Sequence, residues 1–337
     1  KVDARAEALI FAASRAAHAA QKIRPALAAG NTVVLKPSDT TPESTLELAR
    51  LIGEIYPAGV VNVVLGTGET GEAMVGHPAP AMVSITGSVR AGQAVATGAA
   101  AGLKRSHLEL GGKAPAVVFA DADLPRTARM LADFGYFNAG QDCTAVTRVL
   151  VQDSVYDKFR DLLVAAAKDT ATGHEDDSKN FYGPLNNINH FKTVMNKLNS
   201  LPGHVTVETG GKQCGTRGFF VEPTVLSGVN QDDAVVQEET FGPVLTLQKF
   251  TTEAEAVELA NDVNYALASS VWTSNHSTAM RVSRDLDFGA VWINTHVLLT
   301  AEMPHGGFKY SGYGKDLSLY SVEEYTRVKH VMSDLSA

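Results

Sequence analysis

The stretch Phe137-Asn138-Ala139-Gly140-Gln141-Asp142-Cys143-Thr144-Ala145 sets the expectation for the whole chain, because its cysteine stands between glycine, glutamine and small polar residues. Free cysteines are commonly buried as small apolar side chains, which is the alternative for Cys143. The polar neighbours instead indicate a thiol placed for chemistry. Cys214, the second cysteine, has no such context and is expected in a surface loop.

A second stretch, Leu108-Glu109-Leu110-Gly111-Gly112-Lys113, places a carboxylate at the end of a β-rich run and two glycines after it. Glycine lets another backbone segment or a ligand come close, since it has no side chain to block the approach. A thiol together with a carboxylate suggests covalent catalysis. The alternative for Glu109 is a structural carboxylate that accepts hydrogen bonds from nearby backbone N–H groups.

Short apolar strands alternate with helical patterns, which predicts an α/β fold with a parallel sheet and helices on both faces. The pattern begins again after Lys113, so a domain boundary is expected near Gly111-Gly112. The expected strands are 32–35, 60–65, 81–85, 107–110, 115–119 and 148–151. The expected helices are 4–29 with an interruption at Pro25, one capped by Thr41 with Pro42 at its first position, 125–137 and 155–168.

The composition fits a soluble globular protein of about two domains. The chain has 337 residues, of which 45% are hydrophobic and 20% charged, and its net charge is -8. It lacks the run of about 20 apolar residues that a bilayer span needs. Negative charge without clustered Lys and Arg argues against nucleic acid or an anionic membrane as partner. Two cysteines form no disulfide scaffold and fit a cytoplasmic location, and no metal site is predicted.

Six motifs, in this order, resemble the NAD(P)-dependent aldehyde dehydrogenase superfamily over the region from Lys22 to His330. Within it, the run from Gly140 to Cys143, the triplet Asn294-Thr295-His296 and the run from Glu302 to Lys315 are most similar to the γ-aminobutyraldehyde and betaine-aldehyde branch. The six motifs are Val34-Leu35-Lys36-Pro37-Ser38, Ile85-Thr86-Gly87-Ser88, Glu109-Leu110-Gly111-Gly112-Lys113, Gly140-Gln141-Asp142-Cys143, Glu239-Thr240-Phe241-Gly242-Pro243 and Met303-Pro304-His305-Gly306-Gly307-Phe308-Lys309.

The resemblance implies a partial Rossmann-type cofactor domain in residues 1–111, an α/β catalytic domain in 112–310 and a C-terminal return with an oligomerisation strand in 311–337. The tail from Tyr325 to Met332 alternates as a strand does. In the family a similar strand joins a sheet across subunits. A homo-oligomer, dimer or tetramer, is therefore expected.

The chemistry of an aldehyde assigns roles to the thiol and the carboxylate. The hydrogen leaves as hydride only after a nucleophile has made the carbon tetrahedral, and Cys143 would add as thiolate. Hydride transfer to nicotinamide leaves a thioester, which water activated by Glu109 hydrolyses. By resemblance, Glu239 bonds the nicotinamide ribose and Phe241 packs beside the ring; the alternative for Glu239 is again a structural carboxylate.

Two glycine loops compete for the cofactor phosphates. The loop Gly66-Thr67-Gly68-Glu69-Thr70-Gly71 matches G-x-G-x-x-G, but the acidic residue that this fingerprint requires further on is missing. Thr86-Gly87-Ser88 places a hydroxyl and backbone N–H groups at a helix start, where the dipole favours phosphate. We favour this second loop, with Gly87 and Ser88 at the phosphates, and the resemblance assigns Lys36 to the adenosine ribose.

Ser38 and Asp39 follow Lys36, and NAD-preferring members often carry a glutamate at the position of Asp39 that bonds the ribose hydroxyls. A carboxylate there repels a 2′-phosphate, so NAD is expected rather than NADP. In the alternative, Ser38 and Asp39 form an ordinary turn before Thr41.

The substrate candidates surround the nucleophile in sequence and in the expected closing loop. Asp142 precedes Cys143, while Glu302 and His305 lie in that loop. By resemblance, the set indicates ω-aminoaldehydes such as 4-aminobutanal, whose cationic end is drawn to carboxylates and aromatic faces. In the alternative, Asp142 bonds only its loop and Glu302 is solvated. The expected aromatic walls are Tyr136, Phe137 and Trp292.

The sequence departs from the family before Lys22. Members carry a Pro-Trp-Asn run there, whose amide donates to the oxyanion, whereas the position here falls near Ala13. Loss of one oxyanion donor costs about 2.7 to 4 kcal/mol of transition-state stabilisation. Residues 1–21 are a native start, the product of a frameshift or a remodelled segment. The first strands of the cofactor domain also lack a counterpart, which would leave sheet edges and apolar helix faces uncovered.

Three functions are therefore open: an NAD-dependent aldehyde dehydrogenase, a thiol esterase that needs no cofactor, and an impaired homologue that binds a nucleotide or a partner subunit. Formation of NADH from an aldehyde separates the first from the others. Ester cleavage without NAD separates the second from the third.

Overall fold

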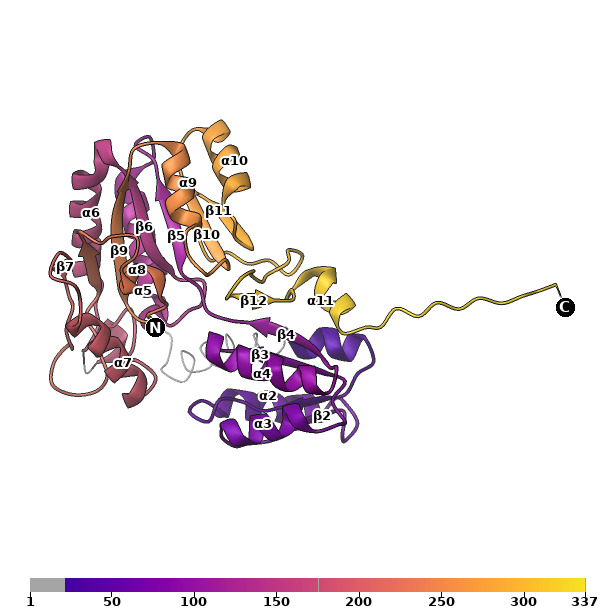
Figure 1. The fold of residues 1–337 in the computed structure, drawn as a ribbon. Helices are drawn as coiled ribbons and strands as arrows, with labels where there is room; N and C mark the ends of the chain where they lie inside the picture. Colours follow the sequence, from indigo (N-terminus) through magenta and orange to yellow (C-terminus); the bar gives the residue numbers. More distant parts are fainter. Residues whose placement is uncertain (1–21, 175, 337) are drawn as a thin grey trace.

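The computed structural model describes residues 22–174 and 176–336, which contain three sheets (Figure 1). The largest has seven strands in the order β11-β10-β5-β6-β9-β8-β7, and all neighbours are parallel except β7 with β8. A two-stranded sheet holds β1 and β2, and a three-stranded sheet holds β12, β4 and β3. This mixed, mostly parallel architecture confirms the α/β fold class.

The core of the molecule lies on both faces of the seven-stranded sheet. Every residue of β5 (Ala114–Val118) and β10 (Ala268–Trp272) is buried, because helices cover both faces of the sheet. Ala116 and Val118 pack with α5 (Leu124–Tyr136), α6 (Tyr156–Lys168) and α7 (Ile188–Asn199), whereas Val117 packs with α9 (Glu253–Asn261) and α10 (His276–Asp285). The remaining strands of this sheet are β6 (Val146–Gln152), β7 (Thr206–Thr209), β8 (Thr224–Ser227), β9 (Val244–Phe250) and β11 (Ala290–Ile293).

The first part of the chain, with β12 added from the C-terminal return, forms the smaller sheets, which lie below the large one in Figure 1. None of the residues of α2 (Glu43–Gly53) and α3 (Gly68–Gly76), all of them described, is buried. Leu46 and Leu51 expose 40% and 45% of their surface, in agreement with the expected uncovered helix faces. The division into domains at Gly111 stays a prediction. The other elements here are β1 (Val33–Leu35), β2 (Val61–Val63), β3 (Met82–Thr86), α4 (Val89–Ala101), β4 (Arg105–Glu109) and β12 (Gly312–Tyr313).

Two local expectations are wrong. Helix α2 begins at Glu43, and Pro42 rather than Thr41 is the N-cap, without a side-chain cap bond. Among the described residues, 22–28 form a helix that continues through Pro25, so the expected interruption is absent there. Gly30 follows that helix with φ 78°, the left-handed conformation in which glycine commonly ends a helix.

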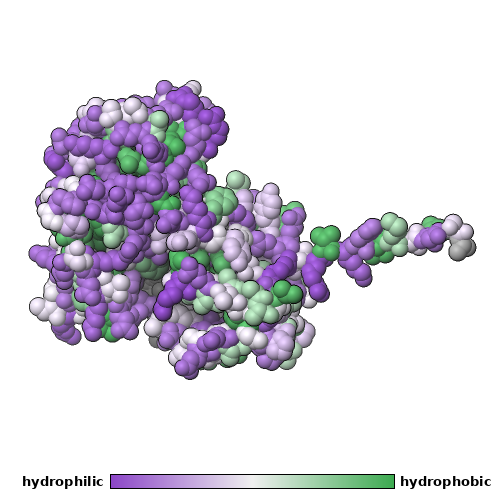
Figure 2. Space-filling model, viewed as in Figure 1, coloured by the Kyte–Doolittle hydropathy of each residue, from purple (hydrophilic) through white to green (hydrophobic). Residues whose placement is uncertain are grey.

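The C-terminal return runs from β12 through α11 (Ser318–Glu324) into a tail that leaves the body (Figure 1). Residues 327–336 pair with no strand of the described chain. Val328, Val331 and Met332 are almost fully exposed, and Figure 2 shows hydrophobic residues along the projecting tail. The structure assigns no strand to the tail, so the predicted oligomerisation strand and the homo-oligomer stay predictions.

Candidate active site

The centre of the site is the crossover from the three-stranded to the seven-stranded sheet. β4 ends at Glu109, and Gly111 and Gly112 lead on to β5. A Cβ on Gly111 would lie 2.3 Å from Oε2 of Glu239, and one on Gly112 would lie 2.2 Å from the carbonyl oxygen of Cys143. The backbone contact makes glycine necessary at Gly112, whereas a side chain at Gly111 would displace the Glu239 carboxylate. The two glycines thus bring the thiol loop and a second carboxylate against the end of β4.

The loop that carries the thiol has a strained backbone. Asn138 and Ala139 have φ values of 52° and 59°, a region that non-glycine residues rarely enter. Two reciprocal hydrogen bonds hold the turn: Asn138 Nδ2 donates to the carbonyl oxygen of Gln141 (2.9 Å), and Gln141 Nε2 donates to that of Asn138 (3.0 Å). Strain that is locked by its surroundings is typical of active sites.

Cys143 is half-buried, and the charged groups with the largest effect on it are acidic. Burial raises the pKa of its thiol well above the usual value, and the charges of Asp142, Glu109 and Glu239 raise this pKa further. The neutral thiol is therefore the resting form. The attacking thiolate has to be made by transfer of the proton to a base.

Glu109 has the properties of that base. Its side chain is 4% exposed, and Oε1 has no hydrogen-bond partner among the described residues. Burial raises the pKa of Glu109 to about 8 and Asp316 adds to this shift, whereas Lys22, His107 and Lys315 oppose it. A carboxyl with this pKa exchanges protons close to neutral pH, as a general base requires.

Glu239 and Phe241 lie beside the crossover. Glu239 Oε1 accepts a hydrogen bond from the backbone N–H of Gly112 (3.0 Å). This bond is the structural role that the sequence analysis gave as the alternative for Glu239. Burial raises the pKa of Glu239, while this bond and two nearby lysines lower it. Phe241 has a φ of 53°, and its carbonyl oxygen lies 2.7 Å from His190 Nε2. Their roles toward the nicotinamide ribose and ring stay predictions.

The favoured phosphate loop lies where β3 leads into α4. Ser88 is the N-cap of α4, and its hydroxyl oxygen accepts a hydrogen bond from Ala91 N (3.3 Å), which confirms the predicted helix start. Gly87 N donates to the carbonyl oxygen of Glu109 (3.0 Å). This bond ties the loop to the residue that carries the base.

Lys36 lies beside the competing glycine loop. Its Nζ donates to the carbonyl oxygens of Pro37 (2.7 Å) and Gly66 (3.1 Å). Ser38 Oγ and Thr40 Oγ1 are 3.1 Å apart in an exposed turn that also contains Asp39. Ser38 and Asp39 thus lie in the ordinary turn that was the alternative to a role in cofactor binding. Contacts of Lys36, Ser38 and Asp39 with an adenosine ribose stay predictions.

The substrate candidates lie in different settings. Asp142 Oδ1 accepts hydrogen bonds from the backbone N–H and the hydroxyl of Thr144, both at 2.7 Å. These bonds within its own loop are the alternative role that the sequence analysis gave for Asp142. Phe137 and Glu302 are exposed, whereas His305 is buried, with its backbone paired to the segment before α11. Their substrate roles stay predictions.

Tyr136 and Trp292 were also predicted to line the substrate site, and this prediction is wrong for Tyr136. Tyr136 is fully buried in the core, and its hydroxyl donates to the carbonyl oxygen of Thr224 (3.1 Å). Trp292 is half-buried, and its ring centre lies 4.8 Å from that of His296.

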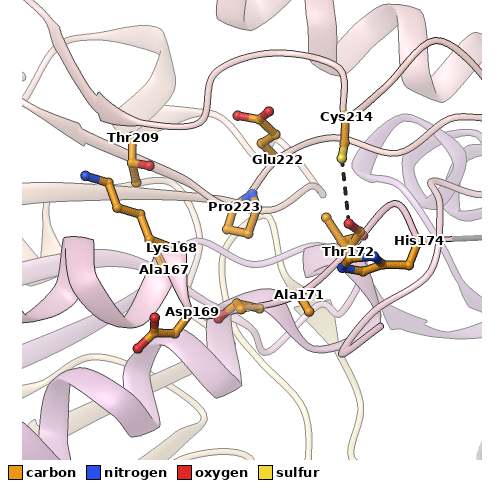
Figure 3. A pocket seen from close by; sticks show the side chains of 11 residues that line it. Ala167, Lys168, Asp169, Ala171, Thr172, His174, Thr209, Cys214, Glu222 and Pro223 are labelled. Carbon is orange, nitrogen blue, oxygen red and sulfur yellow. Dashed lines mark hydrogen bonds between the residues drawn. The ribbon is translucent and has the colours of Figure 1, made fainter. Parts of the chain in front are cut away.

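Cys214 is half-buried rather than on the surface. Its Sγ lies 3.6 Å from the carbonyl oxygen of Thr172, at a hollow of ≈ 350 Å³ (Figure 3). None of the residues that line this hollow belongs to the site around Cys143.

Three buried basic side chains support the site without having been expected there. Arg148 in β6 donates to the carbonyl oxygen of Lys113 (3.0 Å) and to two carbonyls in α9. Burial lowers the pKa of Lys113 to about 7. Burial also lowers the pKa of His296 to about 4, and its Nε2 lies 2.7 Å from the carbonyl oxygen of Thr144. A single basic residue within an apolar strand, as at Arg148, is the sequence signal that identifies such a role.

These features define a class, an α/β protein with a thiol–carboxyl site at the junction of two sheets. The chain belongs to the aldehyde dehydrogenase family, whose model matches residues 15–331. This confirms the family that the six motifs predicted.

Known relatives and solved structures agree with that assignment. The chain is 45% identical over 315 residues to an aldehyde dehydrogenase of Emericella nidulans, a match that covers 92% of the chain and 63% of the relative. It is 42% identical over 320 residues to betaine aldehyde dehydrogenase of Bacillus subtilis, covering 93% and 65%. A crystal structure of a Staphylococcus aureus betaine aldehyde dehydrogenase mutant in complex with NAD⁺ matches with a TM-score of 0.92 and 38% identity, covering 95% of the chain and 66% of that structure.

The chain thus spans 63% to 66% of the length of these proteins. Among its described helices, none has the length and apolar character that a membrane crossing requires.

Proposed function

We propose that this chain oxidises an aldehyde to the carboxylate with NAD, through a thiohemiacetal and then a thioester on Cys143. The observation that carries the proposal is the convergence of Cys143, Glu109 and Glu239 at the glycine crossover. The names of the relatives, which include aldehyde and betaine aldehyde dehydrogenases, support the same reaction.

The chain's own residues perform the proton transfers of this reaction. The Cys143 thiol gives its proton to Glu109, and the thiolate adds to the aldehyde carbon. The backbone N–H of Cys143 is the candidate donor to the resulting oxyanion. NAD, when bound, supplies the nicotinamide that accepts the hydride. Glu109 then releases its proton and takes one from the water that hydrolyses the thioester, which frees the carboxylate and the thiol.

The residues present fit NAD. Gly87 and Ser88 are exposed at the N-terminus of α4, a helix of 13 residues whose dipole favours a pyrophosphate. Asp39 is exposed in the turn after β1, where its carboxylate would bond ribose hydroxyls and repel a 2′-phosphate. We therefore favour NAD over NADP, and the NAD⁺ complex of the S. aureus relative supports this choice.

The function is tested by the formation of NADH when the purified chain is mixed with NAD and an aldehyde. Ester cleavage without any NADH formation would instead identify a thiol esterase. Loss of both reactions in a folded chain would leave an impaired homologue, as the missing oxyanion amide near Ala13 suggests; that position lies outside the described residues.

We propose an ω-aminoaldehyde as substrate, recognised through the charge of Asp142. We expect kcat/KM for 4-aminobutanal to exceed that for butanal by tenfold or more, since about 1.4 kcal/mol of charge recognition gives that factor. Asp142→Asn should shrink this ratio and leave butanal activity in place, because asparagine keeps the Oδ1 acceptor that Thr144 uses. Steady-state rates with both aldehydes measure the ratio.

The matched control for the substrate test is Asp153→Asn, which removes an aspartate charge that lies outside the thiol loop. Equal kcat/KM values for the two aldehydes in the unmodified chain would contradict charge recognition and leave only general aldehyde oxidation.

We also propose that the exposed tail joins subunits. Deletion of residues 327–337 should convert the homo-oligomer into monomer or aggregate, because Val328, Val331 and Met332 then no longer add a strand to a partner's sheet. The deletion begins after Glu324 and Tyr325, which contact the body. Light scattering coupled to size exclusion measures the change.

A full-length variant with Val328→Ser and Met332→Ser separates apolar contacts from tail length. A mass that stays the same after the deletion would rule out the tail as the subunit contact.

A further inference from the structure

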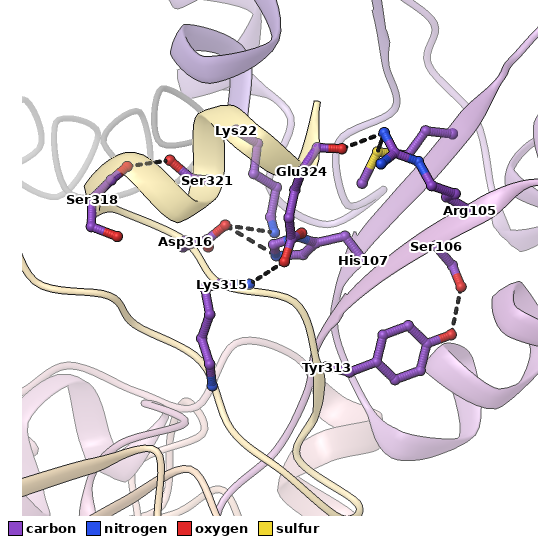
Figure 4. Close-up of polar contacts among 11 residues, drawn as sticks. Lys22, Arg105, Ser106, His107, Tyr313, Lys315, Asp316, Ser318, Ser321 and Glu324 are labelled. Atoms are coloured by element: carbon purple, nitrogen blue, oxygen red, sulfur yellow. Dashed lines mark hydrogen bonds and ion pairs between the residues drawn. The ribbon is translucent and has the colours of Figure 1, made fainter. Parts of the chain in front are cut away.

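A buried polar cluster behind Glu109 joins β4 to the C-terminal return. His107, two residues before Glu109, is fully buried. Its Nδ1 hydrogen-bonds Oε2 of Glu324 at the end of α11, and its Nε2 lies 3.2 Å from Oδ1 of Asp316 (Figure 4). Lys22 Nζ lies 3.3 Å from the same Asp316 oxygen. The cluster therefore holds two carboxylates, one lysine and the imidazole.

The charges in this cluster depend on one another. Burial lowers the pKa of His107, but the nearby Asp316 carboxylate and the hydrogen bond with Glu324 outweigh burial and the opposing charge of Lys22, and the net shift is upward. Burial acts to raise the pKa of Asp316, yet His107 and Lys22 bring it down to about 2. The geometry thus favours an imidazolium between two carboxylates. The ring of Tyr325 stacks at 6.5 Å from that of His107.

The same cluster acts on the base. Residues two apart in a strand point to the same face, so His107 and Glu109 share one face of β4. β4 pairs with β12, and the chain then passes His107 so closely that a Cβ on Gly314 would lie 2.6 Å from Nδ1. The charged groups that shift the pKa of Glu109 are the negative Asp316, which favours its protonated form, and the positive Lys22, His107 and Lys315, which favour its carboxylate.

We propose that His107 is a positioning residue for Glu109: it holds Asp316 and Glu324 of the C-terminal return against β4, so that the buried base faces a paired acidic cluster. The role goes beyond a structural clamp, because the imidazolium also supplies positive charge on the face of β4 that carries the base. This inference rests on the proposed function in one respect, the assignment of Glu109 as the general base.

The test replaces His107 by glutamine, which keeps polar contacts and removes the positive charge. Ionised Glu109 is the active form, so the rate rises with pH through about 8 in the unmodified chain. In His107→Gln the midpoint should move upward by about 1 pH unit, the lower end of the effect of a nearby charge. The midpoint is read twice, from the pH profile of NADH formation and from the infrared carboxyl band that disappears in Glu109→Gln.

The control is His204→Gln, which removes an exposed histidine paired with Asp233 at 2.9 Å and should leave both midpoints in place. The infrared band reports on Glu109 without turnover, so a chain that forms no NADH defeats the proposed function and still tests His107. An unchanged infrared midpoint in a folded His107→Gln variant overturns the inference.

If His107→Gln fails to fold, ¹⁵N NMR of the histidine rings in the unmodified chain decides the matter. The proposal requires His107 to stay protonated while Glu109 titrates near pH 8, in line with the upward shift of the His107 pKa. A His107 midpoint below that pH would mean that no imidazolium stands between Asp316 and Glu324 while Glu109 titrates, and the proposal would fall.

Discussion

Replacement of Cys143 by alanine is expected to abolish NADH formation from aldehydes and cleavage of activated esters together, because both reactions use its sulfur as nucleophile. The fall should be roughly 10⁴- to 10⁶-fold, the range seen when residues of a covalent catalytic unit are removed. The substitution deletes one half-buried atom, so the fold and NAD binding should persist. Initial rates of both reactions and calorimetric titration with NAD measure these outcomes.

Cys214→Ala is the matched control, since it makes the same change at the only other cysteine, near the hollow in Figure 3. Both activities should survive it. Ester cleavage at its original rate in Cys143→Ala would assign the nucleophile to another group and overturn the site.

Replacement of Glu109 by glutamine should slow thioester hydrolysis by roughly 10² to 10⁴, the contribution of a positioned base. Glutamine keeps the size of the side chain but cannot take a proton from water. The charge of Glu109 also raises the pKa of the Cys143 thiol, so its loss makes the thiolate easier to form without a base. At alkaline pH we expect a burst of NADH followed by a stall, which stopped-flow absorbance resolves.

Glu47→Gln is the control, since it changes an exposed glutamate that pairs with Arg50 on α2. It should change neither the size of the burst nor the steady-state rate. Equal loss of the burst and of the steady-state rate at every pH would make Glu109 a structural group.

The parts of the fold that depend on local pattern could be predicted. The predicted strands 115–119 and 148–151 correspond to β5 and β6, because strands covered on both faces are rich in apolar residues, with Arg148 as a polar exception. The helix start at Ser88 was also readable, since its cap bond lies within the same turn. The start of α2 was not: Thr41 has the right chemistry for a cap, but Pro42 takes that position.

The electrostatics of the site could not be predicted, because they arise from residues far apart in the sequence. Glu109 owes its raised pKa to burial between two sheets and to Asp316, which the chain reaches only after the whole large sheet. Arg148 donates to carbonyls of the distant helix α9. The link between Cys143 and Glu109 came from resemblance to a family, since no pattern in the residues specifies their approach.

The glycine crossover has a consequence for how the protein could vary. Glu109 stands on one sheet and Cys143 on the loop that enters the other, with two residues that lack side chains between them. The separation of Glu109 and Cys143 therefore depends on how the two sheets are placed on either side of Gly111 and Gly112. Substitutions that shift one sheet relative to the other would change this separation, and with it the reaction rate, while every catalytic side chain stayed the same.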